Sequence, residues 1–437
     1  MGDERPAMTP ENTPPMPARG LRRLMPPLLR EQEFRRFWIG QTISMFGDQI
    51  TAFALPVVAV LALGAEATQM GLLVAIGLLP HLLFSLPAGA WLDRVQHRRR
   101  LMILMDLGRA AAIVSIPIAF WLGWLSLPLL FLVFFVVGTL SVVFDIAWNT
   151  LFVAVAKRDQ YVEANSLLNG SRSLSNVGGP ALAGVLIQVL SAPLALVADA
   201  LSFVGSALFL TRVRASEAPI EQDPGSIRSH LAAGLTFLVR DPIIRPSVLS
   251  VATMNLFNYC FQGLFVLYVL KYLAVEPGIL GLALGVGAVG SVLGALVAAR
   301  VGRRLGIGRA WILGLILFPG ATILVPVAAP GMPMPIILTL LFVAEFVSVF
   351  GVMILDINGS AMLFARTPDR IRGSANGAFR FVNMGVRPIG AVLGGVLGGL
   401  IGVRETLFVV TIAQLAGLLW LIGSPIPGLR DMPEAAE

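Results

Sequence analysis

The sequence predicts an all-α integral membrane protein with 12 transmembrane helices in two parallel six-helix pseudo-repeats. Three observations lead to this fold class: the composition, a series of apolar stretches of spanning length, and an internal repeat. Hydrophobic residues make up 56% of the 437 residues and charged residues 13%, against about 25% charged residues in soluble domains. The mean hydropathy is +0.82. Lipid is therefore expected to cover most of the surface.

Twelve stretches have the length that crosses the hydrocarbon core, roughly 20 apolar residues. Each is expected to form a helix, because backbone groups in lipid must be hydrogen-bonded within their own segment. In chain order they are residues 38–63, 69–92, 101–122, 127–153, 167–190, 192–211, 247–270, 278–299, 310–330, 333–357, 376–401 and 405–424.

Residues 1–36 precede the first span. Residues 1–27 are rich in proline and polar residues and predict a cytoplasmic tail. "LLREQEFRRFW" (28–38) is basic and aromatic, which is typical of a segment at the membrane interface. Residues 425–437 form a second predicted cytoplasmic tail.

The two halves of the chain resemble each other. "ANSLLNGSRSLSNVGGPALAGVL" (164–186) aligns with "ANGAFRFVNMGVRPIGAVLGGVL" (375–397), 211 positions further on, and the same spacing relates Asp145 to Asp356. With six spans in each half, both halves have one orientation. This predicts a parallel repeat about the membrane normal.

The longest connection, residues 212–246, separates an N-terminal bundle (37–211) from a C-terminal bundle (247–424). Apolar residues recur there near helical spacing, at Ile227, Leu231, Leu235 and Leu238. We expect a cytoplasmic linker with an amphipathic helix along the membrane surface.

Basic residues gather in alternate connections. One side carries many Arg and Lys residues, including Arg94, Arg98 to Arg100, Lys157, Arg212 and Arg303, whereas the other offers Lys271 and Arg404. Cytoplasmic loops carry this excess of positive charge. Both termini and the linker are therefore predicted to be cytoplasmic.

The loop after the second span, "GAWLDRVQHRRRL" (89–101), combines one acid with a cluster of bases. Its pattern resembles the loop signature of the major facilitator superfamily, with departures at Trp91, Gln96 and His97. The resemblance covers residues 30–424 and includes a weaker copy in the second half, which has Ala298 and Ala299 in place of the acid–base pair. It implies the two-bundle fold of that family.

The resemblance also implies a cytoplasmic latch. An anion is stabilised at a helix N-terminus by about 0.3–1 kcal/mol, and in this family the acid meets the start of span eleven, here residues 374–377. Asp93 is thus expected to hold the cytoplasmic side shut, with Arg94 and Arg98 engaging Asp145. In the alternative reading the bases only enforce topology. The predicted latch residues are Gly89, Asp93, Arg94, Arg98 and Asp145.

Two further stretches narrow the resemblance. "FWIGQTISMFGDQITAFALP" (37–56) is similar to the first span of the bacterial macrolide-efflux and enterobactin-exporter-like branch. "GPALAG" (179–184) resembles part of a motif of drug–proton antiporters, although small residues also serve close helix packing.

The resemblance implies a secondary active transporter in the bacterial inner membrane. We expect proton-coupled export of a small amphiphilic or hydrophobic compound, such as a drug, macrolide or siderophore, by alternating access. The alternatives are proton-linked uptake of a nutrient and, in a third class, a non-transporting sensor or membrane enzyme.

Two carboxyls lie deep within predicted spans. Asp48 is about 16 Å into the first span at 1.5 Å per residue, and Glu345 lies at a similar depth in the tenth. A carboxylate at the bilayer centre costs about 2.5–3.5 kcal/mol, so each should line a cavity or find a partner. Asp48 and Glu345 are the predicted proton-coupling residues; the alternative is a protonated carboxyl in a helix contact.

Other ionisable residues suggest charge pairs inside the membrane. Asp106 and Arg109 share one turn of the third span, and Asp145 could pair with Arg172, unless Arg172 meets an anionic substrate. In the second half, Asp356 is expected to pair with Arg380 or Arg387.

Polar amides within spans predict a substrate cavity, with interhelical hydrogen bonds as the alternative. These residues are Gln41, Asn255, Asn258 and Gln262.

The sequence has no phosphate-binding loop of the G-x-x-x-x-G-K type and no H-E-x-x-H motif, and its three histidines are isolated. We therefore expect no catalytic residues, no metal, no cofactor and no nucleic-acid partner. The expected partners are a small-molecule substrate, protons and the lipid bilayer, and the chain is expected to be a monomer and not an enzyme.

Overall fold

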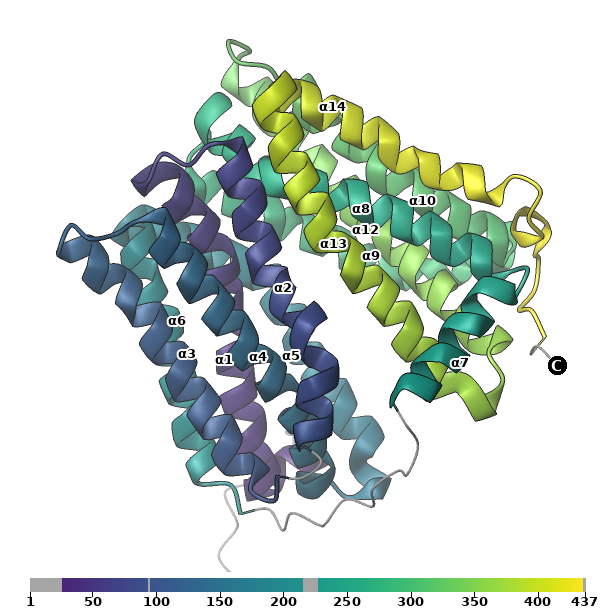
Figure 1. The fold of residues 1–437 in the computed structure, drawn as a ribbon, viewed down its shortest axis with the longest axis horizontal. Coiled ribbons are helices and arrows are strands. Elements are labelled where there is room, and N and C mark those ends of the chain that lie inside the picture. The colour runs from purple at the N-terminus through teal and green to yellow at the C-terminus, as the bar shows by residue number, and fades with distance from the viewer. Residues whose placement is uncertain (1–25, 93–94, 215–226, 435–437) are drawn as a thin grey trace, which may run out of the picture.

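The computed structural model describes residues 26–92, 95–214 and 227–434 (Figure 1). These residues form helices and connections, with no strand among them. Within this described part, 12 helices are long and apolar enough to cross a membrane. The predicted fold class, an all-α protein with 12 spans, is thereby confirmed.

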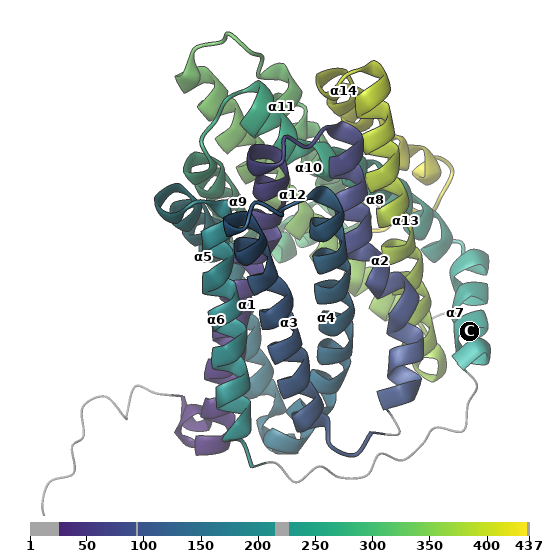
Figure 2. The ribbon, with the colours of Figure 1, turned by 60° about the vertical axis from the view of Figure 1, so that its left-hand side comes forward.

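The first half contains α1 (Gln32–Val57), α2 (Ala67–Leu92), α3 (Arg98–Trp121), α4 (Leu127–Val155), α5 (Tyr161–Leu190) and α6 (Ala192–Thr211). The second half contains α8 (Ile244–Leu267), α9 (Pro277–Leu305), α10 (Ile307–Thr322) with the short α11 (Leu324–Val327), α12 (Met334–Arg366), α13 (Arg372–Ile401) and α14 (Val403–Gln414). The spans that begin with α1 and α8 end in π-helical turns, Val58–Ala62 and Tyr268–Tyr272, and the last span ends in 3₁₀ turns, Leu415–Leu421. The two halves stand side by side as two bundles (Figures 1 and 2).

Several helices extend beyond the predicted spans. α5 begins at Tyr161 instead of residue 167, and α12 continues to Arg366 instead of residue 357. Hydropathy identifies only the part of a helix that lies in hydrocarbon, whereas the extra turns carry polar residues. Asp356 is therefore well inside α12 and not near its end.

The segment before the first span differs from the prediction. Residues from Gln32 onward belong to α1, and Leu28, Phe34 and Phe37 are buried within the N-terminal bundle. The backbone N–H of Leu28 also donates to Glu163 Oε1 at 3.2 Å. The interfacial segment predicted for residues 28–38 is thus part of the bundle core, because its apolar side chains find helices and not lipid.

The linker helix α7 (Ile227–Arg240) is attached to the C-terminal bundle. Leu238 is buried, and Gly234 packs so closely on the start of α13 that an added Cβ would overlap the carbonyl of Ser374. Asp241 then accepts hydrogen bonds from the backbone of Ile243 and Ile244, both at 2.9 Å. The side chains of Ile227 and Leu231, which contribute to the predicted apolar face, lie outside the described residues.

The two ends of the molecule are packed differently. We call the end that carries loops 95–97, 156–160 and 241–243 the linker end, and the end that carries loops 63–66 and 273–276 the far end. At the far end the bundles touch: a Cβ on Gly395 of α13 would lie 3.0 Å from Cα of Gly71 in α2, and one on Gly184 of α5 would lie 3.1 Å from Cα of Gly281 in α9. Glycine is required at these crossings because backbone meets backbone.

At the linker end, α5 and α13 stand clear of the opposite bundle. A Cβ added to Gly170 of α5, or to Gly373 or Gly377 of α13, would meet no atom within 4 Å. A hydrogen bond from Gln188 Nε2 to Glu276 Oε2 (2.8 Å) joins the bundles at the far end. The structure is therefore closed at the far end and open at the linker end.

We predict that Gly184→Leu separates the bundles at the far end, because the side chain must displace the backbone of α9. Overpacking of this kind costs about 1–3 kcal/mol. Spin labels at Val189 of α5 and Leu282 of α9, both exposed, should report longer distances than in the parent protein. The native Cys260 is buried and does not compete for label.

Gly170→Leu is the matched control, since it lies on the same helix in open space. An unchanged distance distribution in Gly184→Leu would show that this crossing does not hold the far end closed.

Candidate functional site

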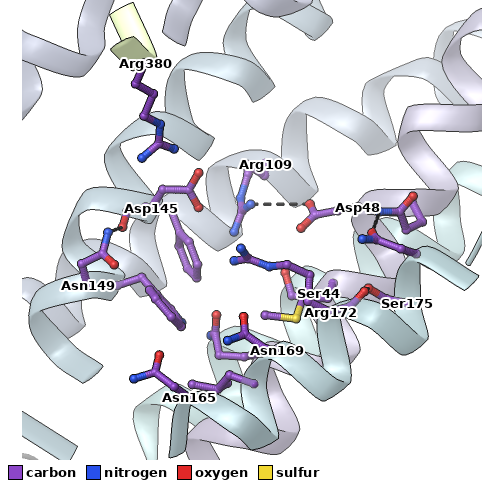
Figure 3. A pocket seen from close by; sticks show the side chains of 17 residues that line it. Ser44, Asp48, Arg109, Asp145, Asn149, Asn165, Asn169, Arg172, Ser175 and Arg380 are labelled. Atoms are coloured by element: carbon purple, nitrogen blue, oxygen red, sulfur yellow. Dashed lines mark hydrogen bonds and ion pairs between the residues drawn. The ribbon is translucent and has the colours of Figure 1, made fainter. Parts of the chain in front are cut away.

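A polar cavity of about 500 Å³ lies between the bundles (Figure 3). It is lined mainly by α1, α4 and α5 of the first half, and α13 contributes Arg380. Several of its side chains are exposed near the linker end, including Asp145, Asn149, Asn165 and Arg172. The cavity therefore reaches the open end of the molecule.

Arg109 forms the base of this cavity. Its side chain is 3% exposed and makes an ion pair with Asp106, one turn away on α3, whose side chain is fully buried. The guanidinium lies between two aromatic rings, with Cζ 4.3 Å from the centroid of Phe144 and 4.2 Å from that of Phe203. Cation–π contacts are strongest where water is excluded. Arg109 is thus held in one position by α3, α4 and α6.

Asp48 lies beside Arg109 and is joined to it by a dashed line in Figure 3. Its Oδ1 is 3.7 Å from Nη1 of Arg109, and its side chain is 49% exposed. It lies at the middle of the span Gln32–Ala62. Asp106 is sealed behind the guanidinium while Asp48 faces the cavity, so of the two carboxyls beside Arg109 it is Asp48 that solvent or a ligand can reach.

A third carboxyl, Asp199, is buried behind the same helices. It accepts hydrogen bonds from Thr51 and from Ser202 (3.0 Å to Oδ1), and its exposure is 0%. Gly47 makes this approach possible, because a Cβ there would overlap Asp199 and Ser202. The sequence analysis did not assign Asp199 to the site; Ser202, one turn later on the same helix, was the available signal.

Asp145 faces the polar cavity from α4. The cations whose charge acts on it include Arg109, Arg172 and Arg380, and Figure 3 shows Arg380 directed toward it. Among the described residues, however, no ion pair within 4 Å joins Asp145 to Arg172. The expected direct pair is not formed, because both side chains turn into the open cavity.

The floor of the polar cavity is a stripe of polar residues along one face of α5. The sequence analysis did not identify these residues as a group. Asn165, Asn169, Arg172 and Asn176 all line the cavity, at intervals of three or four residues. Residues at this spacing share one face of a helix. This periodicity was the signal that could have identified them. Gln49 of α1 donates to Asn176 Oδ1 at 2.8 Å and anchors the stripe.

A second, more apolar cavity of about 490 Å³ continues from the first toward the far end. Asp48 and Gln49 line both cavities. Its walls come from both halves and include Phe53, Leu78, Phe134, Phe265 and Val266. This shape and lining are typical of a site for a small ligand with an apolar body.

The four amide residues predicted to line one substrate cavity lie at three different cavities. Gln41 is buried beside the polar cavity, and Gln262 lines the apolar one. Asn255 belongs to a third cavity inside the C-terminal bundle, and Asn258 lies between that cavity and the apolar one.

Glu345 is outside these cavities. It lies on α12 against α9, where a Cβ on Gly287 would be 3.3 Å from Glu345 Oε2. The prediction grouped it with Asp48 as a residue near the centre of the membrane, but the helical phase of α12 directs it away from Arg109 and toward a helix contact.

Asp356, Arg380 and Arg387 all line the third cavity. No ion pair within 4 Å joins Asp356 to either arginine, although all three are described. Arg387 instead donates to the hydroxyl of Tyr259 at 3.1 Å. The expected pairing of Asp356 is therefore replaced by an arrangement around an open space.

No group of three or more His, Cys, Asp or Glu side chains suited to a metal ion occurs in the described part of the chain.

A protein-family model described as the Major Facilitator Superfamily matches residues 37–353. The chain belongs to the major facilitator superfamily. As a member of this superfamily it is a transporter and not an enzyme, and its spans make it a multi-pass membrane protein.

Relatives in this superfamily span nearly the whole chain. The chain is 26% identical over 402 residues to a protein of Mycolicibacterium fortuitum named multidrug efflux pump Tap, covering 90% of this chain and 95% of that one. It is also 26% identical over 418 residues to YfiS of Bacillus subtilis, an uncharacterized MFS-type transporter, covering 92% and 96% of the two chains.

Solved structures of other transporters share the fold. A bacterial homologue of the iron transporter ferroportin has a TM-score of 0.73 at 19% identity, covering 91% of this chain and 99% of that chain. The nucleoside transporter NupG has a TM-score of 0.68 at 13% identity, covering 89% of this chain and 98% of that chain.

The latch role predicted for the loop signature at residues 89–101 stays a prediction. Asp93 and Arg94 lie outside the described residues, and Gly89 has open space beside it. Arg98 is buried at the start of α3, and Asp145 faces the polar cavity. Their contact in the state with a closed linker end stays a prediction.

We predict that Asp106→Asn destabilises this transporter by about 3–5 kcal/mol, because Arg109 then loses the buried carboxylate that it contacts directly and keeps only the more distant Asp48. The measurement is the free energy of unfolding of the purified protein in detergent. Asp369→Asn is the matched control, since the side chain of Asp369 is 87% exposed and exposed pairs contribute about 0–1 kcal/mol. Equal losses in the two variants would contradict the role given to Arg109 and Asp106.

Proposed function

We propose that the chain is a proton-coupled exporter of small amphiphilic or hydrophobic compounds. One observation carries the proposal: Asp48 lines both the polar and the apolar cavity and faces the buried guanidinium of Arg109 at 3.7 Å. A change in the charge of Asp48 is therefore felt by the guanidinium and by any ligand in the apolar cavity.

Charge balance supports a proton as the coupled ion. Arg109 is one buried cation, and Asp48, Asp106 and Asp199 surround it with three carboxyls. Unbalanced charge in a low-dielectric interior costs several kcal/mol. Two of the three carboxyls must therefore be neutral for the cluster to balance the single guanidinium, and bound protons supply that neutrality. Asp48 is the carboxyl that opens to the cavity.

The coupling step is an exchange at Asp48. A proton on Asp48 removes its attraction to Arg109, and a ligand in the adjoining cavity then meets a neutral carboxyl. Loss of that proton restores the ion pair and changes the charge that the ligand meets. One charge that crosses 100 mV supplies about 2.3 kcal/mol, which corresponds to a concentration ratio of about 50.

The direction of transport depends on which end of the molecule faces the cytoplasm. The linker end carries most of the Arg and Lys residues of the loops, and we assign it to the cytoplasm. The cavities then open to the cytoplasm in this structure and would take up substrate there. Two relatives at 25–26% identity named multidrug efflux pump Tap support export.

The latch is expected to act in the other conformation, in which the linker end is closed and the far end is open. The residues that we assign to this closure are Gly89, Asp93, Arg94, Arg98 and Asp145. The start of α13 at Ser374, which would receive Asp93, already packs against Gly234 of α7, so movement of α13 carries the linker helix with it.

Uptake of a small anionic nutrient is the second candidate. The observation that favours it is the exposure of Arg172 and Arg380 in the polar cavity, since neither has an ion pair within 4 Å among the described residues. Two such guanidiniums can bind a carboxylate or phosphate.

Reconstituted vesicles test the proposal. With an acidic lumen, we expect the full-length protein to accumulate Hoechst dye or a macrolide as protons leave. Asp48→Asn should lower this gradient-driven accumulation by roughly tenfold or more, the scale of a lost proton-transfer group. Exchange of substrate without a gradient should persist. Asp369→Asn, an exposed carboxyl outside the cavities, is the control.

Unchanged accumulation in Asp48→Asn would reject the coupling role of Asp48, and loss in Glu345→Gln instead would transfer it to Glu345. Accumulation of an organic anion driven by an acidic exterior would favour uptake.

A further inference from the structure

The third cavity, here called the side cavity, lies within the C-terminal bundle between α8, α10, α12 and α13. It has a volume of about 340 Å³, within the usual range for small ligands. Asn258 separates it from the apolar cavity and Arg380 from the polar cavity, because each residue lines both spaces. The side cavity therefore adjoins both central cavities.

The side cavity is lined by one acid, Asp356, and by two arginines, Arg380 and Arg387, and Asp356 pairs with neither of them. Arg387 on α13 is the cation whose charge acts on Asp356 of α12, yet no contact within 4 Å joins them. Arg387 donates to Tyr259 Oη at 3.1 Å and lies 5.0 Å from the centre of its ring. The other arginine, Arg380, is directed toward Asp145 in the polar cavity (Figure 3). Opposite charges are thus held apart across an open space.

Polar atoms around this space lack partners. Asn258 is 8% exposed, and no donor among the described residues reaches its Oδ1. Nε of Arg387 likewise has no acceptor in the described part of the chain. By contrast, Asn255 donates to Asn383 Oδ1 at 2.7 Å and is satisfied. A buried polar atom without a partner costs about 1–3 kcal/mol, which a ligand can recover.

The remaining wall is aromatic. Trp311 and Phe318 come from α10 and Phe379 from α13. Gly359 lets the indole approach α12, since a Cβ there would stand 2.7 Å from Nε1 of Trp311. Flat rings of this kind pack against an aromatic or other apolar group.

We propose that the side cavity binds an aromatic zwitterion of the amino-acid type, with its carboxylate on Arg387, its ammonium between Asp356 and Asn258 Oδ1, and its ring against Trp311. A lone anion would leave Asp356 without a cationic partner, and a lone cation would leave Arg387 without an anionic one, whereas a zwitterion provides both. Binding at this site does not depend on the proposed function, whereas its use as a substrate site rests on that function.

Three matched compounds test the site: L-phenylalanine, 3-phenylpropionate, which lacks the ammonium, and phenethylamine, which lacks the carboxylate. Binding is measured by calorimetry on the full chain in lipid nanodiscs without an ion gradient. L-Phenylalanine should bind roughly tenfold or more tightly than either analogue, the scale of one charged hydrogen bond.

Two variants should give a crossed pattern. Arg387→Gln should lower the affinity for L-phenylalanine to that of phenethylamine and leave phenethylamine unchanged, whereas Asp356→Asn should lower it to that of 3-phenylpropionate. General misfolding would weaken all three compounds alike. Arg370→Gln and Asp369→Asn, both exposed and outside the cavities, should change nothing.

Failure of L-phenylalanine to bind at millimolar concentration, equal affinity for the three compounds, or a uniform loss in Arg387→Gln would each overturn the proposal. Because binding is measured without a gradient, these outcomes are separate from the transport assay of Asp48→Asn. Absence of proton-driven accumulation by the unsubstituted protein, with the crossed binding pattern retained, would reject the exporter mechanism alone.

Discussion

The placement of Arg109 is the constraint on which the rest of the site depends. A guanidinium within a membrane protein must be satisfied, and here Asp106, Phe144 and Phe203 satisfy it from three helices. Asp48 completes the arrangement from α1 at 3.7 Å. Four helices of one bundle therefore converge on a single charge. The position of that charge, rather than any one carboxyl, determines which acidic group is sealed and which opens to the cavity.

The glycine contacts explain why this charge lies at the base of an opening. Backbone meets backbone at the far end, through Gly71, Gly184, Gly281 and Gly395, whereas Gly170 and Gly377 on the same helices as Gly184 and Gly395 face open space. Close crossings at one end and clearance at the other leave the space between the bundles open at the linker end. The polar cavity is the space that this asymmetry leaves, and its mouth is lined by residues of α4 and α5.

The internal repeat has diverged in chemistry while its geometry remains. The stripe Asn169, Arg172 and Asn176 on α5 corresponds, 211 positions later, to Arg380, Asn383 and Arg387 on α13. Both stripes face a cavity together with the corresponding acids Asp145 and Asp356. The first half joins its cavity to a buried carboxyl cluster, whereas the second encloses a smaller space with separated charges and aromatic walls. Equivalent helix faces thus support different binding chemistry.

The sequence by itself determined that lipid surrounds the protein, the number of spans and the division into halves. Hydropathy, charge and repeat spacing can all be read along the chain without knowing how the helices pack. The sequence also placed Asp48 correctly at the middle of its span, since depth follows from counting residues. Only the tertiary structure decided which polar residues meet. Asp48 faces Arg109 while Glu345 packs on α9, and Asp356 stands apart from Arg387. Those outcomes depend on the rotation of each helix about its axis and on the packing of its neighbours, which no single span encodes.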